Sequence, residues 1–105
     1  MYSDVVKALK DAGFKVVGER VDEPIPGTLK LKEEGMKYTA DTFGRKKIYW
    51  TFSVRTRAHS VTELEDISKN VAEALYEKFD TVWDFTADFN NLEANIVFVM
   101  EEYVE

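Results

Sequence analysis

The strongest constraint on the fold is a change of hydrophobic period within residues 46–79. In residues 48–57, IYWTFSVRTR, apolar and polar side chains alternate with the period of two that is typical of a β-strand. One face is apolar and the other is mostly polar or basic: Ile48, Trp50, Phe52 and Val54 against Tyr49, Thr51, Ser53, Arg55 and Arg57. We therefore predict that Trp50 and Phe52 lie in the core.

After Ser60 the apolar side chains recur every three or four residues, as they do on the buried face of a helix. They are Val61, Leu64, Ile67, Val71, Leu75 and Phe79. The tetrapeptide that begins at Ser60 and ends at Glu63 matches a capping box, in which the serine and glutamate side chains each accept a hydrogen bond from the other's amide. We predict a strand that leads directly into a helix over residues 60–79.

The first 27 residues predict a short helix, a strand and a break. Ser3 is placed to cap a helix, and Gly13 supplies a left-handed residue to end it. We predict a strand over residues 14–20, FKVVGER. Residues 22–27, DEPIPG, contain two prolines two positions apart, which a central strand does not accommodate.

Two short alternating segments follow this break. Residues 28–32 place Leu29 and Leu31 on one face, and residues 36–40 alternate again after Glu33-Glu34-Gly35. We interpret these three residues as a turn, so that the two segments form a hairpin.

A second hairpin is predicted at the end of the chain. Residues 81–89 alternate, with Trp83, Phe85, Ala87 and Phe89 on one face, and Asn90-Asn91 suits a tight turn. Residues 92–104 return as a long strand. The sequence therefore predicts one α+β domain over residues 1–105: a mostly antiparallel sheet with a short N-terminal helix and a longer central helix packed on one face.

Composition excludes several classes of active site. The chain has no cysteine, which excludes a thiolate nucleophile and thiolate metal ligands. Its one histidine, His59, precedes a predicted helix cap, and a single histidine cannot form a metal site of several histidines. The five glycines match no phosphate-binding fingerprint. We expect no catalytic residue, cofactor or metal, and hence no enzyme. No segment near either end is long and apolar enough to span a membrane, so we expect a cytosolic protein.

Charge is divided unevenly along the chain. Residues 1–60 hold 12 basic and 8 acidic residues, whereas residues 61–105 hold 2 basic and 12 acidic ones. Either these charges lie on solvated faces, or complementary surfaces meet head to tail between copies. The candidates for such an interface are Arg45, Lys46, Lys47, Tyr49, Arg55, Arg57, Asp84, Asp88, Glu101 and Glu102.

The order of elements resembles that of the small tail-completion, or tail-terminator, proteins of long-tailed bacteriophages. The segments that carry the resemblance are VVKALKDAGFKVV, DEPIPG, IYWTFSVRTRAHS leading into VTELEDISKNVAEALYEKF, and NIVFVMEEYVE. The resemblance implies a non-catalytic ring, commonly of six copies, that caps the tail tube and meets the head connector. It also implies that the protein acts in the host cytoplasm during assembly and then in the virion tail.

Two other uses of the basic strand remain open from the sequence. A stand-alone binding or regulatory module would present Arg55 and Arg57 to an acidic protein partner. Nucleic-acid binding would use Tyr49 beside these arginines, but the strand offers one exposed aromatic and the chain carries a net charge of −6. We therefore expect no sequence-specific nucleic-acid binding.

Overall fold

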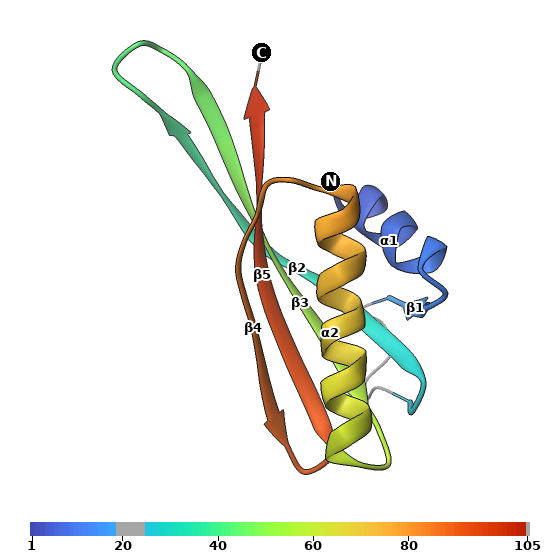
Figure 1. Ribbon diagram of the computed structural model, residues 1–105. Coiled ribbons are helices and arrows are strands. Elements are labelled where there is room, and N and C mark those ends of the chain that lie inside the picture. Colours follow the sequence, from blue (N-terminus) through green and yellow to red (C-terminus); the bar gives the residue numbers. More distant parts are fainter. Residues whose placement is uncertain (19–24, 105) are drawn as a thin grey trace.

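The computed structural model describes residues 1–18 and 25–104, which form two helices and one five-stranded sheet (Figure 1). The elements are α1 (Tyr2–Asp11), β1 (Lys15–Val17), β2 (Thr28–Ala40), β3 (Lys46–Arg57), α2 (Val61–Lys78), β4 (Val82–Asn90) and β5 (Glu93–Val104). The strand order is β1-β2-β3-β5-β4, and every pair is antiparallel except β1 with β2. The predicted α+β class with a mostly antiparallel sheet is confirmed.

The start of α1 differs from the sequence prediction. Ser3 lies inside the helix, and Met1 is the N-cap, because its carbonyl accepts hydrogen bonds from the amides of Asp4 and Val5. At the other end Gly13 has a φ of +96°, as predicted, and Phe14 donates back to the carbonyl of Leu9 at 3.1 Å. This is a Schellman ending, which turns the chain into β1.

The predicted strand at residues 14–20 is shorter in the structure, where β1 spans Lys15–Val17. Residues 19 and 20 lie outside the described part of the chain, as do residues 22–24 of the predicted break. The rest of that break is a turn, in which Thr28 donates to the carbonyl of Ile25 at 3.0 Å and Gly27 has a φ of +85°.

The predicted hairpin within residues 28–40 is wrong. β2 runs without a turn through this range and pairs along its length with β3. Glu33 lies opposite Phe52 and Gly35 lies opposite Thr51, so Glu34 is an extra residue in a β-bulge. The bulge shifts the phase of the alternation by one residue, and this shift is what looked like a turn in the sequence. The hairpin joins β2 to β3 instead, through residues 41–45.

The central helix α2 is close to its prediction. Glu63 donates its amide to the Ser60 side chain at 3.2 Å, which confirms half of the capping box. The Glu63 carboxylate accepts a hydrogen bond from the amide of His59, one residue before the predicted donor, at 2.9 Å. The helix ends at Lys78, and Phe79 follows as an extended C-cap.

The C-terminal hairpin is confirmed, but Trp83 lies on a different face of the sheet from the one predicted. Its turn lies one residue later than the predicted Asn90-Asn91, at Asn91 and Leu92, which both have positive φ. Near the start of β4 the register with β5 shifts between Trp83 and Thr86, where Asp84 has a φ of +52°. This irregularity puts Trp83 on the opposite face from Phe85, although the sequence predicted one face for both.

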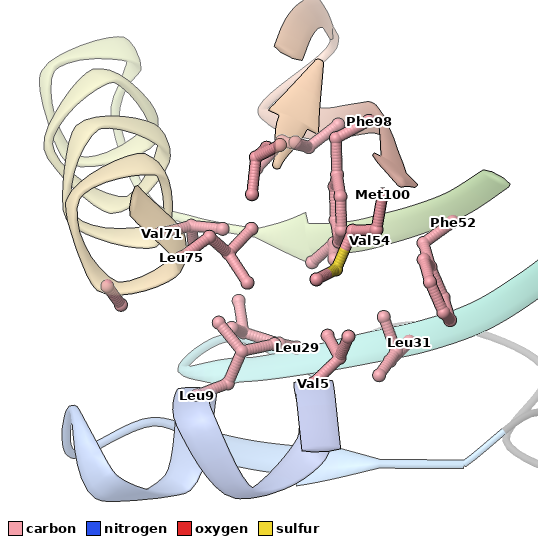
Figure 2. Close-up of a cluster of buried hydrophobic side chains, with 13 residues drawn as sticks. Val5, Leu9, Leu29, Leu31, Phe52, Val54, Val71, Leu75, Phe98 and Met100 are labelled. Carbon is pink, nitrogen blue, oxygen red and sulfur yellow. The ribbon is translucent and has the colours of Figure 1, made fainter. Parts of the chain in front are cut away.

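Both helices lie over one face of the sheet and bury a single main core against it (Figure 1, Figure 2). Figure 2 shows Val5 and Leu9 of α1 and Val71 and Leu75 of α2 directed toward side chains of β2, β3 and β5. Phe98 stacks on Phe52 at 5.5 Å between ring centroids and on Phe85 at 6.1 Å. Phe52 is fully buried as predicted, whereas Trp50 is half-buried at the margin of the core.

Candidate functional site

The sheet is longer than the helices that cover it. The far half of β2 and the start of β3 extend past both helices as a hairpin, which we call the arm and define as residues 35–48 (Figure 1). The end of β5 pairs with the β3 half of the arm. Met36 lies opposite Trp50, and Tyr38 lies opposite Ile48, so these side chains continue the core-facing side of the sheet. Met36 is 52% exposed and Tyr38 is 51% exposed. The apolar face of the sheet therefore continues into solvent.

The tip of the arm is held in shape by Asp41. Its carboxylate accepts hydrogen bonds from the amides of Phe43 and Arg45, each at 2.9 Å, and from the Arg45 Nε at 2.7 Å. Desolvation acts to raise the pKa of Asp41, but these hydrogen bonds outweigh it and lower the pKa below the usual value. The Arg45 guanidinium lies 5.5 Å from the Phe43 ring centroid. Phe43, 83% exposed, is therefore presented on an ordered turn.

Two of the predicted interface residues, Arg55 and Arg57, contact an acidic residue of the same chain. Both lie on the side of the sheet that the helices leave open, and they flank the Glu93 carboxylate at 3.6 Å and 2.8 Å. The basic strand β3 thus lies beside the acidic strand β5, and part of the charge asymmetry of the sequence is neutralised within the fold. An acidic partner of Arg55 and Arg57 has to compete with Glu93.

Lys47 and Glu101 form a second such pair, on the same open side. The Lys47 Nζ lies 3.0 Å from Glu101, which is 7% exposed, and the Trp83 Nε1 donates to the same carboxylate at 2.8 Å. The hydrogen bond from Lys47, with the one from Trp83, lowers the pKa of Glu101 although burial acts to raise it. The same hydrogen bond raises the pKa of Lys47. This cluster joins β3, β5 and β4.

The neighbouring residues Tyr49 and Glu102 lie on opposite sides of the sheet. Tyr49 is half-buried on the open side, opposite Glu101. Glu102 is on the helix side and accepts a hydrogen bond from the Trp50 Nε1 at 2.8 Å. Each of the two tryptophans therefore donates to a carboxylate of β5, Trp50 to Glu102 and Trp83 to Glu101.

Among the charged residues that form no ion pair within the described chain, those on the arm and on β4 bear on the predicted interface. On the arm these are Lys37 and Lys46, both exposed. On β4, the last strand of the sheet, they are Asp84 and Asp88, also exposed. Of the ten predicted interface residues, Lys46, Asp84 and Asp88 are thus available for a partner outside the subunit.

Among the described residues, no three or more histidine, acidic or cysteine side chains are arranged to hold a metal ion. His59 is exposed and its amide is engaged in the α2 cap. Neither helix is long and apolar enough to cross a membrane.

Comparison with models of known protein families finds no match for this chain, and comparison with curated proteins finds none either. The resemblance to tail-completion proteins therefore stays a prediction that rests on the order of elements.

The exposed apolar residues of the arm were missed by the sequence analysis. Met36 and Tyr38 were placed in the second strand of a small hairpin, and Phe43 was placed in a connection. Phe43-Gly44 was the available signal, because a large apolar side chain beside a turn glycine has no place in a local core.

Proposed function

We propose that this protein is a non-catalytic structural protein that assembles with copies of itself through the arm. The observation that carries the proposal is the exposure of Met36, Tyr38 and Phe43 on one protruding element. Clustered large apolar side chains on a surface are typical of protein interfaces. The turn ordered by Asp41 presents Phe43 in a fixed position, which reduces the entropy lost on binding.

The setting we propose is the head-proximal end of a long-tailed bacteriophage tail. There the protein would close the tail tube as a ring, for which the resemblance implies six copies, and contact tail-tube and head-connector proteins. Two features support this setting. The long strand β3 leads directly into the main helix α2, and a terminal hairpin completes the sheet, as the resemblance implies. A ring also needs two different patches on each copy, and the arm supplies one of them.

The test compares the wild-type protein with a Met36→Ser/Phe43→Ser variant. Light scattering gives the mass of each at rising concentration and low salt, alone and with purified tail tubes. We expect the wild type to reach a defined multiple of the monomer mass, and the arm variant to stay a folded monomer.

The matched control is Ile25→Ser/Val61→Ser, which removes two side chains of similar exposure, 60% and 52%, outside the arm. This control should assemble like the wild type. A wild-type protein that stays monomeric under all these conditions would overturn the proposal. Tail-tube and tape-measure genes beside the gene for this chain would support the phage setting independently.

A further inference from the structure

The edge of the sheet formed by β4 has the properties expected of the surface that receives the arm. β4 is the last strand in the order β1-β2-β3-β5-β4, so among the described elements no strand pairs with its outer side. An uncovered edge of this kind is a common site of contact between chains. β4 lies at one end of the strand order, and β1 lies at the other end, next to β2, which forms half of the arm.

The β4 edge is acidic and partly apolar. Residues 80–90 contain three aspartates and no basic residue, and Asp80, Asp84 and Asp88 are exposed. No ion pair engages these three carboxylates within the described chain. Large apolar side chains lie among them or on the adjacent helix: Trp83 at 53% exposure, Phe89 at 41% and Tyr76 of α2 at 51%.

The arm has the complementary character. Residues 35–48 contain four basic residues and one acidic residue, a net charge of +3 against −3 for residues 80–90. Asp41 and Glu101 engage Arg45 and Lys47, so Lys37 and Lys46 provide the charge that remains for a partner. Both surfaces thus combine exposed large apolar side chains with unpaired charge, and the charges are of opposite sign.

On these grounds, and resting on the proposed function, we propose that the arm of one copy docks on the β4 edge of the next copy. The two lysines lie on opposite sides of the arm, Lys46 on the side of Met36 and Tyr38 and Lys37 on the other. They would approach Asp80, Asp84 and Asp88 from both sides of an edge-on contact, in which the apolar side chains of the two surfaces pack together. The contact is heterologous, because two different patches meet, so it generates closed rings or open chains rather than a twofold dimer. The charges also select which surfaces meet. Two arms repel each other and two β4 edges repel each other, whereas an arm and an edge attract.

Charge reversal tests this contact. The arm variant is Lys37→Glu/Lys46→Glu and the edge variant is Asp80→Lys/Asp88→Lys; Asp84 is kept because its φ of +52° disfavours lysine. We expect each variant alone to raise the concentration at half-assembly by roughly tenfold or more, with a larger effect at low salt. Lys7→Glu/Lys10→Glu, which changes the net charge equally on exposed positions of α1, should have little effect.

The decisive sample is an equimolar mixture of the arm variant and the edge variant. In the mixture every reversed arm meets a reversed edge and every original arm meets an original edge, so assembly should return to near the wild-type concentration. A single chain that carries all four substitutions should assemble as well. If arms instead met arms, the edge variant alone would assemble like the wild type, and the arm variant would assemble with the wild type as readily as with the edge variant.

The failure of this inference is distinct from the failure of the proposed function. A wild-type protein that never assembles contradicts self-assembly itself. A wild-type protein that assembles, an arm variant that does not, and an edge variant that assembles normally would leave the proposed function standing. That last result would overturn the β4 edge as the receiving surface.

Discussion

The covered part of the sheet and the arm share one apolar face but differ in their surroundings. In the covered part, Leu31 and Phe52 are fully buried beneath the two helices. On the same face of the arm, Met36 and Tyr38 are about half exposed. The alternation of side chains is equally regular in both regions. An apolar face in the sequence therefore predicts that something covers it, but does not predict whether the cover comes from the same chain.

The two parts also differ in whether their basic side chains form ion pairs within the chain. On the open side of the sheet, Glu93 and Glu101 of β5 neutralise Arg55, Arg57 and Lys47 of β3. On the arm, Lys37 and Lys46 keep no ion-pair partner among the described residues. A charge is neutralised where the fold places an acidic side chain beside it, as it does for Lys47 and Arg45 of the arm, whereas Lys37 and Lys46 are left for a partner.

The largest expected difference between the two parts is in the stability lost when a large side chain is truncated to alanine. Phe98 is fully buried between Phe52 and Phe85, so Phe98→Ala should lower the free energy of unfolding by about 3–5 kcal/mol. Tyr38→Ala on the arm should change it by less than about 0.5 kcal/mol. Urea denaturation of dilute protein measures both. Equal losses for the two variants would mean that the arm belongs to the covered core.

A smaller difference is expected for buried hydroxyl groups. Thr56 is fully buried, and its Oγ1 donates to the carbonyl of Thr28 at 2.9 Å. Thr56→Val keeps the shape and removes this bond, and it should cost about 1 kcal/mol of unfolding free energy. Thr39→Val, on the arm, is the matched control, and its denaturation midpoint should stay near that of the wild type. A denaturation midpoint for Thr56→Val as high as that of the control would show that the hydrogen bond from Thr56 to Thr28 does not stabilise the fold.

The smallest expected effect depends on pH and concerns Glu101, at the junction between the arm and the covered part. The pKa of this carboxyl is lowered from its ordinary value of 4.5 in the folded protein, chiefly by the hydrogen bond from Lys47. Its contribution to stability is therefore complete above the unfolded-state pKa and is lost as pH falls through the lower folded-state pKa. Glu101→Gln should be less stable than the wild type at neutral pH, and the gap should close in acid.

Thermal unfolding of both proteins from neutral pH to below pH 4.5 measures this gap. Glu102→Gln is the control, because it alters a carboxylate that also accepts a hydrogen bond from a tryptophan but leaves the Lys47–Glu101 pair in place. A gap for Glu101→Gln that stays constant or widens in acid would show that the Lys47 contact does not stabilise the fold.

The elements that were predicted best are those with local signals. The capping serine and the regular apolar positions define α2, and Asn90-Asn91 predicts the last turn to within one residue, because all of these signals act over a few residues. The start of α1 was misplaced, because the carbonyl of Met1 accepts the first amide hydrogen bonds and Ser3 lies inside the helix.

The arm was missed because its cause is non-local. A phase shift at Glu33-Glu34-Gly35 fits either a turn or a bulge, and the choice depends on whether a partner strand extends alongside. β3 is long enough to pair with the whole of β2, so the bulge forms. The same holds for charge: the pairing of Arg55 and Arg57 with Glu93 follows from β3 lying beside β5, which no local pattern reveals. Among the site residues, the basic run before β3 was identified, but the apolar side chains of the arm were not.

The most direct test of the central claim is amide hydrogen exchange measured by mass spectrometry at low and at high protein concentration. The claim is that the arm is uncovered in one copy and covered by another. In dilute protein, peptides from residues 35–48 should exchange faster than peptides from the covered halves of β3 and β5. At high concentration the arm peptides should become protected while the core peptides do not change. An arm that exchanges equally at both concentrations, in samples whose mass shows assembly, would contradict the account.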